Sequence, residues 1–385
     1  LRIAVLNRQF CATGGGAERY SIALVEQLAA RHEIHVFAQH IEHSWPGVTY
    51  HQVSKPLNRP RWVNQLWYAT RTWWATRTGF DVVHSHENSW HGNVQTVHVV
   101  PVRFNLLHGL GAWPLLARWM KIITSPRLLV YLALEATRFS QRGPRAVVVT
   151  APIMLPAMRQ AYPRCHPTVL TPGVERVVGR ASAAQKGAAR AQLGLPAEGF
   201  CILLVGNDYR KKGLGCLIEA LAQLPQSCCV AVVGNPAQRA HFTTQARAAG
   251  VEQRVFFLGS LPDVGVAYQA CDCLAHPTLE DTFAMVVLEA MAHGLPVLLS
   301  GEKYCGIAGL LQPERDALLL ADPRDAAALT SALLRLLQEP DLVAALRQAG
   351  LEFARQYLWQ SLALQQESLY LTLTKYGGQG VCDRR

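Results

Sequence analysis

The sequence lacks several short motifs by which metal, cofactor and nucleotide sites are commonly recognised. It contains no C-x-x-C pair, no D-x-D, no G-x-G-x-x-G and no P-loop with its Lys and Ser or Thr. These absences exclude the usual zinc pattern, the common dinucleotide-binding turn and the Walker-type phosphate loop. The missing D-x-D is also the pair that commonly holds a divalent ion, so we expect no metal and no resident cofactor.

The ten cysteines form no pattern typical of disulfides or zinc sites. Apart from Cys228 with Cys229 and the pair Cys271-x-Cys273, they are isolated in the sequence. Several fall inside apolar runs, where a free thiol behaves as a small apolar side chain. This usage is typical of a reduced protein, and no signal peptide precedes the first strand-like run, so we expect a cytoplasmic location.

No apolar run is long enough, without interruption, to cross a membrane. The best candidate is residues 112–136. Arg118, Lys121 and Arg127 interrupt it, and Pro126 would break a helix near its middle. We therefore expect that this stretch does not cross a membrane.

Length and charge indicate two domains with different tasks. A chain of 385 residues is too long for a single hydrophobic core of ordinary size. Its composition, with 50% apolar and 17% charged residues, is that of a folded protein. Residues 1–175 hold 18 Lys and Arg against 8 Asp and Glu, whereas the remainder has 19 against 19. The first half should therefore meet an anionic partner, such as a phosphorylated substrate, an acidic membrane surface or nucleic acid, unless the charge serves solubility alone.

Apolar strand-like runs alternate with helical segments twice along the chain. Continuous apolar strands separated by helices are typical of a parallel sheet covered on both faces. The sequence predicts an α/β fold of two Rossmann-like doubly wound domains, residues 1–172 and 173–355, facing across a cleft. A polar, Ala-rich linker is expected at 176–198, and an amphipathic helix within 356–385 is expected to pack back on the first domain. The runs are 2–6, 34–38, 81–86, 94–100 and 146–150, then 201–207, 229–235, 254–259, 271–277 and 295–300.

An acidic pair stands directly before a predicted apolar helix. Glu280 and Asp281 precede residues 284–293, whose composition favours a helix, and Thr282 is its expected N-cap. The free amides at this helix N-terminus favour an anion. The residues that carry these amides are Phe283, Ala284 and Met285.

A further carboxylate, Glu289, lies inside this apolar helix. An unpaired carboxylate would be costly there, and sugar hydroxyls are suitable hydrogen-bond partners for it. The simpler alternatives are an exposed helix carboxylate at Glu289 and a capping role for Asp281.

A basic loop follows the first predicted strand of the second half. Asn207 ends the strand-like run, and Arg210, Lys211 and Lys212 precede the next predicted helix. Positive groups at the end of a strand suit a diphosphate and offset the charge that develops on it when its bond to a sugar breaks. The alternative is an ordinary solvated loop.

Two features of the first half are weaker candidates for a binding site. Gly15 and Gly16 belong to a Gly-rich loop that lets the backbone approach a ligand closely, or that forms only a flexible turn. His98 ends a predicted strand, where a structural role is the alternative. His84, His86 and His91 are close in sequence, but no carboxylate or Cys completes a metal set.

The spacing of Asp281 and Glu289 resembles the acidic signature of the retaining glycosyltransferases of family four. In that signature seven residues separate two Glu, and "EAMAHGLPV" at 289–297 is close to the family's usual continuation. The resemblance covers nearly the whole chain and is strongest over 173–296. It implies the two-domain GT-B fold and retaining, metal-independent transfer of a hexose from a nucleotide diphosphate sugar.

The resemblance also implies roles for individual residues. Asp281 would bind the transferred sugar, although it is one methylene shorter than the family's Glu and Glu280 could replace it. Glu289 would bind the ribose, and Lys212 with either Arg210 or Lys211 would hold the diphosphate. Asp281, Lys212 and His98 are the expected catalytic residues. The expected donor site further includes Gly15, Gly16, Asn207, Phe283, Ala284 and Met285.

Within the family, the chain is most similar to members that add glucose to a heptose of the lipopolysaccharide core. UDP-glucose is therefore the expected donor and a lipopolysaccharide or other glycolipid the expected acceptor. A GDP-mannose-dependent mannosyltransferase and a nucleotide-sugar epimerase are the enzymatic alternatives. A non-enzymatic basic adaptor is the third, but no helix-turn-helix or RRM pattern favours nucleic acid.

A phosphorylated lipid acceptor would also account for the basic first half, since each Lys or Arg near an anionic membrane contributes about 1 kcal/mol. We therefore expect peripheral association with the inner leaflet of the cytoplasmic membrane. Tryptophans interleaved with basic residues resemble an interfacial surface, and at least half of these tryptophans are expected to be core residues. The tryptophans are Trp62, Trp67, Trp73, Trp74, Trp113 and Trp119, among Arg61, Arg71, Arg77, Arg118 and Lys121.

Overall fold

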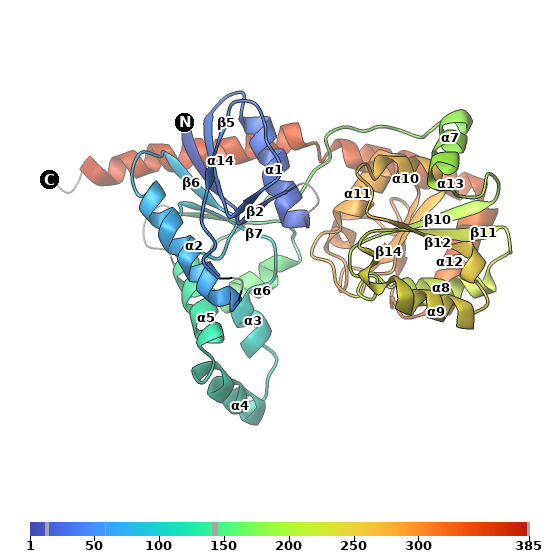
Figure 1. The fold of residues 1–385 in the computed structure, drawn as a ribbon, viewed down its shortest axis with the longest axis horizontal. Coiled ribbons are helices and arrows are strands. Elements are labelled where there is room, and N and C mark those ends of the chain that lie inside the picture. Colours follow the sequence, from blue (N-terminus) through green and yellow to red (C-terminus); the bar gives the residue numbers. More distant parts are fainter. Residues whose placement is uncertain (12–14, 58, 141–144, 383–385) are drawn as a thin grey trace. The chain divides into compact units, whose positions relative to one another are not determined.

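The computed structural model describes residues 1–11, 15–57, 59–140 and 145–382, which fold into two compact units (Figure 1). The first unit joins Leu1–Pro172 to the C-terminal segment Trp359–Arg385, and the second comprises Gly173–Leu358. Each unit has its own main sheet and its own buried residues.

In the first unit, a seven-stranded sheet has the order β5-β3-β1-β6-β7-β8-β9, and its strand pairs are parallel. The chain winds outward from β1 through β3 to β5 and then continues on the other side of β1 with β6, which is the doubly wound arrangement. The strands are β1 (Arg2–Leu6), β3 (Glu33–Ala38), β5 (Val48–Gln52), β6 (Val82–Ser85), β7 (Val94–Val97), β8 (Ala146–Val149) and β9 (Thr168–Val169), beside a ribbon of β2 (Gln9–Phe10) and β4 (His40–Ile41).

The helices of the first unit include a protruding group. Figure 1 shows α4 at the end of an extension that it forms with α3 and α5. The helices are α1 (Gly16–Leu28), α2 (Arg61–Thr76), α3 (Val102–Leu107), α4 (Ala112–Ile123), α5 (Pro126–Arg138), α6 (Met154–Ala161) and α14 (Trp359–Cys382).

In the second unit, a six-stranded parallel sheet has the order β12-β11-β10-β13-β14-β15. Its strands are β10 (Phe200–Val205), β11 (Cys228–Val233), β12 (Val255–Gly259), β13 (Cys273–His276), β14 (Val297–Ser300) and β15 (Leu318–Leu320). Its helices are α7 (Ala183–Leu193), α8 (Leu214–Gln223), α9 (Arg239–Ala248), α10 (Gly265–Ala270), α11 (Met285–Ala292), α12 (Ala326–Gln338) and α13 (Pro340–Arg355), with short 3-10 turns η1 (Pro236–Gln238), η2 (Glu252–Arg254) and η3 (Gly306–Leu310).

The core of the second unit follows the alternation of its strands. Ile202 and Leu204 of β10 and Val230 of β11 pack with buried residues of α8, α9 and α12. Figure 1 shows these three helices on one face of the sheet, and α10, α11 and α13 on the other. Both faces are therefore covered, which is why the strands are apolar throughout.

The predicted α/β fold of two Rossmann-like domains is confirmed, and every predicted apolar run contains a strand. The sequence does not predict β5, β9 or β15. β5 is an edge strand whose residues are all at least partly exposed, so it has no continuous apolar run, and the other two strands are very short.

The prediction of a linker at 176–198 is wrong, because this segment contains α7. Ser182 and Gln185 form a capping box at its start, and Gly194 ends it in the left-handed conformation. Arg190 is buried and donates to the carboxylate of Asp272, which also accepts from the backbone of β10. The Ala-rich composition belongs to a mostly exposed helix that this arginine anchors.

The apolar stretch at 112–136 forms two helices, α4 and α5, that are separated at Thr124 and Ser125. Pro126 is the first residue of α5, where it needs no backbone donor. Across the described parts of the chain, no helix has both the length and the apolarity needed to cross a membrane.

The expectation that at least half of the six tryptophans are core residues is wrong. Trp62 is partly buried, but the other five are exposed. The helical periodicity of the sequence does not distinguish buried from exposed tryptophans, because α2 and α4 each present one wide surface to solvent. The five exposed side chains are those of Trp67, Trp73, Trp74, Trp113 and Trp119.

The C-terminal helix α14 packs on α1 of the first unit. Tyr370 of α14 lies with its hydroxyl 2.6 Å from Nδ1 of His84, whose Nε2 lies 2.6 Å from the Thr96 hydroxyl. Burial lowers the pKa of His84 to about 3, so the imidazole is neutral near pH 7. At the surface, Glu367 pairs with Arg31, which fixes the helix at a second point.

Close packing at Gly213 positions the loop between β10 and α8. Gly213 has φ +77°, and a Cβ there would lie 1.9 Å from the carbonyl oxygen of Pro277, at the end of β13. Only glycine allows this approach. The preceding loop residue, Lys212, is thereby held next to the end of the neighbouring strand.

Replacing Gly213 by Ala should lower the free energy of unfolding by at least about 2 kcal/mol, because it adds both a clash and backbone strain. The matched control is Gly187→Ala within α7, where a Cβ meets nothing within 4 Å. That change should raise the free energy by about 0.5–1 kcal/mol. Urea unfolding of both variants checks the pair, and equal effects would contradict the packing argument.

Candidate functional site

The basic loop and the acidic stretch meet in the second unit because β10 and β13 are neighbouring parallel strands. Their carboxyl ends lie at the same edge of the sheet, and the loops that follow are hydrogen-bonded together. The carbonyl of Lys211 accepts from the backbone N–H of Leu279 at 2.7 Å and from the Thr278 hydroxyl at 3.1 Å.

An ion pair between Lys212 and Asp281 forms the centre of this region. Nζ of Lys212 donates to Oδ2 of Asp281 at 2.5 Å, and both side chains are only about one-fifth exposed, at 20% and 19%. Nε2 of His276 lies 3.1 Å from the same oxygen, and the backbone N–H of Ala284 donates to Oδ1 at 3.0 Å. Gly206 leaves space for the Lys212 stem, since a Cβ there would lie 2.5 Å from its Cγ.

The partners of Asp281 keep its carboxyl ionised. Burial alone would raise its pKa, but the hydrogen bond from His276 and the positive charge of Lys212 outweigh burial. The pKa of Asp281 therefore lies well below its ordinary value. Burial is also the main influence on His276, and it lowers the pKa of this imidazole despite the nearby carboxylate.

The predicted N-cap of the following helix is wrong. Helix α11 begins at Met285, and its N-cap is Ala284 rather than Thr282. Ala284 has φ 68° and ψ 68°, a left-handed conformation that costs an L-residue about 1–2 kcal/mol. The hydrogen bond to Asp281 and the burial of Phe283 hold this turn, so Asp281 does serve the helix start, as the capping alternative proposed.

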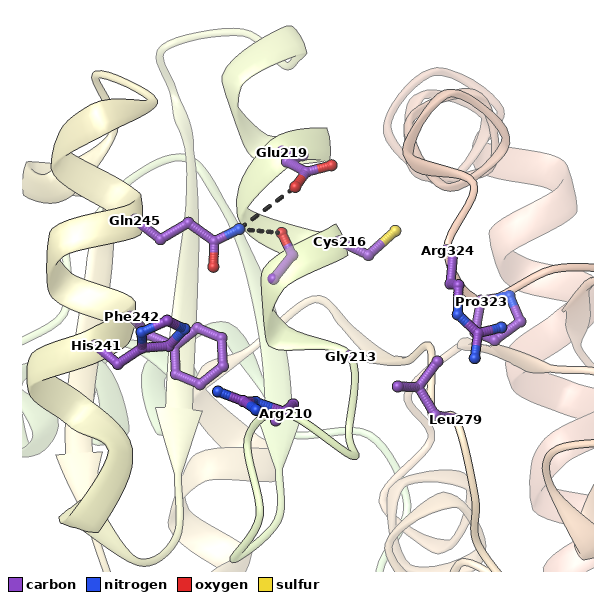
Figure 2. Close-up of a pocket in the computed structure, with 11 residues that line it drawn as sticks. Arg210, Gly213, Cys216, Glu219, His241, Phe242, Gln245, Leu279, Pro323 and Arg324 are labelled. Carbon is purple, nitrogen blue, oxygen red and sulfur yellow. Dashed lines mark hydrogen bonds between the residues drawn. The ribbon is translucent and has the colours of Figure 1, made fainter.

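The structure separates the two candidates for a second diphosphate residue. Lys211 pairs with Glu280 at 3.0 Å, next to the Lys212–Asp281 pair, and both side chains are exposed. Arg210 lines a pocket of about 280 Å³ between α8 and α9, which His241, Phe242 and Leu279 also line (Figure 2). Lys211 therefore forms its ion pair beside Lys212, whereas Arg210 lines this pocket.

Glu289 of α11 is partly buried and hydrogen-bonded. The Tyr268 hydroxyl donates to its Oε2 at 2.8 Å, and the ring of His293 stacks on Tyr268 at 5.0 Å. An ordinary exposed carboxylate is therefore not the correct description. Tyr268 and His276 are two site residues that the sequence does not indicate, because their partners lie elsewhere in the chain or beyond a turn.

The remaining predicted residues lie at two other places. Oδ1 of Asn207 accepts from the backbone N–H of Asn235, so it joins the loops after β10 and β11. Gly15, Gly16 and His98 belong to the first unit. Gly15 is the N-cap of α1, and Gly16 is its first residue. Nε2 of His98 lies 3.0 Å from Nδ1 of His86, and burial lowers the pKa of His98 to about 3.

The ring of His86 in the first unit contacts the rings of His84 and His98. Within the described residues, no group of three or more His, Cys, Asp or Glu side chains is placed to hold a metal ion. The site in the second unit offers instead two cationic side chains, two acidic side chains beside them, and a third carboxylate on α11. Such a set can bind an anion and several hydroxyl groups together.

Two family models match the chain, and together they take in most of it. The model for glycosyl transferases group 1 matches residues 185–353, and the model for Glycosyltransferase Family 4 matches residues 14–177. The chain belongs to the group 1 glycosyltransferases. The family resemblance inferred from the acidic signature is thereby confirmed.

Two curated relatives of this glycosyltransferase carry different names. Lipopolysaccharide glucosyltransferase WaaG of Escherichia coli strain K12 is 33% identical over 172 residues, which are 44% of this chain and 44% of that protein. A D-inositol 3-phosphate glycosyltransferase of Corynebacterium aurimucosum is 29% identical over 219 residues, 54% of this chain and 49% of that protein. The matched region thus spans about half the length of these relatives.

Solved structures share the GT-B fold with this glycosyltransferase. A crystal structure of WaaG matches with a TM-score of 0.78 at 23% identity, covering 94% of this chain and 98% of that one. A structure of Anabaena HepE in complex with UDP and glucose matches with a TM-score of 0.74 at 19% identity, covering 96% and 99%. The predicted GT-B fold class is confirmed.

Asp281→Asn should lower the free energy of unfolding by about 2 kcal/mol at pH 7, because it leaves Lys212 without its counter-ion. Since the folded-state pKa of Asp281 lies below an unfolded value of about 3.9, this difference should be constant above about pH 5 and shrink as the pH falls below about 4. Urea unfolding at several pH values measures it.

The control for this change is Asp341→Asn, at an exposed position in the first turn of α13. It should change the free energy of unfolding by less than about 1 kcal/mol. A pH-independent loss in Asp281→Asn would contradict the electrostatic explanation.

Proposed function

We propose that this protein is a retaining, metal-independent hexosyltransferase that moves glucose from UDP-glucose to a sugar of the lipopolysaccharide core. The observation that carries the proposal is the Lys212–Asp281 pair, with Lys211 and Glu280 beside it and Glu289 on the helix that follows. Membership in the glycosyltransferase family, and the likeness to a lipopolysaccharide glucosyltransferase over 44% of the chain, support it.

Each part of the donor has a matching group in this proposal. Lys212 and Lys211 hold the diphosphate and offset the negative charge that develops on it as the sugar leaves. Glu289, oriented by Tyr268, accepts from the ribose hydroxyls. Asp281 and the backbone amides of Phe283 and Met285 bind the transferred sugar, while the Ala284 N–H holds Asp281.

Transfer with retention proceeds as a front-side displacement. The bond between the anomeric carbon and the diphosphate oxygen breaks, and the acceptor oxygen bonds to the same face of that carbon. The departing phosphate oxygen takes the acceptor's hydroxyl proton, so this route needs no carboxylate nucleophile. Cationic side chains at the diphosphate stabilise this transition state more than the ground state, because charge accumulates on the leaving group.

A phosphorylated polyol is a second acceptor class that one observation favours. The relative from Corynebacterium aurimucosum, matched over 54% of this chain, is named for D-inositol 3-phosphate. The excess of Lys and Arg in residues 1–175 suits a phosphate on either acceptor. Product analysis with a lipopolysaccharide core and with an inositol phosphate as acceptors distinguishes the two.

A donor screen by thermal shift tests the donor assignment. UDP or UDP-glucose at 100 times its dissociation constant should stabilise the protein by about 2.7 kcal/mol. Lys212→Met should abolish the shift, whereas Arg210→Met should retain it, because Arg210 lies in the pocket between α8 and α9. A response to GDP and GDP-mannose alone would favour a mannosyltransferase, and no response to any nucleotide would refute the proposal.

Helix α4 provides a surface for membrane association at the inner leaflet. Its exposed apolar ridge consists of Trp113, Leu116, Trp119, Met120 and Ile123, of which Trp113 is 82% exposed. Arg118 and Lys121 flank it on the same helix. Apolar side chains that enter the lipid interface beside cations that meet lipid phosphates are the two elements of peripheral binding. We infer that this ridge binds anionic membranes.

The double change Trp113→Ser, Trp119→Ser should weaken binding to phosphatidylglycerol-containing vesicles at least tenfold, because it removes two large apolar side chains from the ridge. Co-sedimentation measures the binding. The control is Leu364→Ser, Leu371→Ser, at two exposed positions of α14, which should bind like wild type. Undiminished binding of the tryptophan variant would contradict the assignment.

A further inference from the structure

His276 is a fully buried imidazole at the end of β13 and directly contacts the site. Its side chain is 0% exposed, and its Nε2 lies 3.1 Å from Oδ2 of Asp281. Its Nδ1 is also buried and has no hydrogen-bond partner. A neutral imidazole carries one proton, and only Nε2 has an acceptor, so the proton is assigned to Nε2, which donates to Asp281.

The three groups around the Asp281 carboxylate differ in burial and in kind. The His276 ring is fully buried at the end of β13, and the Ala284 N–H belongs to the backbone of the turn before α11. Lys212 reaches Asp281 through a long flexible stem and is partly exposed. Lys212 is also the group that a diphosphate would attract, because a doubly charged anion competes strongly for an ammonium.

Binding of a donor therefore removes a stabilising partner from Asp281. If Lys212 turns toward the diphosphate, the largely buried carboxylate loses its counter-ion, and an unpaired buried carboxylate is costly. The hydrogen bonds that remain come from His276 and Ala284. The Oδ2 position that Lys212 vacates becomes available to a hydroxyl of the transferred sugar.

We propose that His276 is a positioning residue, whose Nε2–H holds the Asp281 carboxylate in place and oriented toward the donor sugar while the diphosphate occupies Lys212. This inference rests on the proposed function, because it requires a nucleotide diphosphate at Lys212. His276 itself is too deeply buried to touch the sugar, so it acts through Asp281 alone.

This role predicts that loss of the His276 hydrogen bond affects the binding of two kinds of ligand differently. A free nucleoside diphosphate contacts Lys212 and Glu289 but presents no sugar to Asp281. A nucleotide sugar needs Asp281 as well. Both ligands draw Lys212 away from Asp281, so loss of the His276 hydrogen bond should weaken binding of each. Only the nucleotide sugar also needs the oriented carboxylate as a hydrogen-bond partner, so its affinity should fall much further, whereas general damage to the fold would weaken both equally.

Three variants of His276 test this difference by isothermal titration with UDP and UDP-glucose, and with GDP and GDP-mannose if wild type prefers guanine. His276→Gln can place an amide N–H near the position of Nε2. His276→Asn is equally polar but too short to reach Asp281, and His276→Met fills similar space without a donor. Thermal unfolding of each variant shows that it is folded.

In His276→Asn and His276→Met, the dissociation constant of the nucleotide sugar should rise at least tenfold more than that of the free diphosphate. His276→Gln should recover most of the sugar-dependent affinity. Wild-type affinity for the nucleotide sugar in all three variants would overturn the inference, as would equal losses for both ligands or a Gln variant no better than Asn. If wild type binds neither ligand, the proposed function fails, and the inference fails with it.

Discussion

The site depends on one constraint, the mutual neutralisation of Lys212 and Asp281 in a largely buried position. Neither charge is stable there alone, since removing one partner of such a pair leaves the other desolvated and uncompensated. A ligand that separates them must therefore bring a negative group for the lysine and hydrogen-bond donors for the aspartate. A free phosphate or a free sugar satisfies only one side, whereas a sugar joined to a diphosphate satisfies both.

The surrounding structure keeps this pair in place through close backbone packing. Gly213 allows its loop to lie against the end of β13, and Gly206 leaves room for the lysine stem. Ala284 accepts a left-handed conformation that places its N–H on Asp281. Strain of this kind persists only where neighbouring contacts determine the geometry, here the buried Phe283 and the bonds to η3. The polar groups of the site are thus oriented before any ligand arrives.

The fold could be predicted from the sequence because the strands of both sheets are buried on two faces and therefore form continuous apolar runs. The prediction of secondary structure failed for elements that are only partly buried. β5 is an exposed edge strand, and α7 is an exposed helix that one buried arginine, Arg190, anchors. The exposed tryptophans of α2 lie away from the face that contains its buried Tyr68, and those of α4 lie on a helix at the end of an extension (Figure 1), which a local pattern does not encode.

The same limit applied to the site. The family resemblance, together with the convergence of parallel strand ends at one edge of a sheet, brought Lys212, Asp281 and Glu289 into one hypothesis. In the structure Lys211 pairs with Glu280 beside the Lys212–Asp281 pair, whereas Arg210 lines a pocket with residues of α8 and α9, a difference that the local sequence does not encode. Tyr268 and His276 were missed because a hydrogen bond to a carboxylate leaves no trace in the local sequence.

The charge is unevenly distributed between the two halves of the chain. In the second half, the carboxylate of Asp281 compensates Lys212, and positive and negative residues there are balanced at 19 each. A surface that meets lipid phosphates has the opposite requirement, because carboxylates beside its cations would weaken the attraction. With 18 positive against 8 negative residues, the first half leaves much of its charge available to an external anion. A lysine that is paired with a carboxylate favours a ligand that satisfies both groups. A surface with uncompensated positive charge attracts anions without such selectivity.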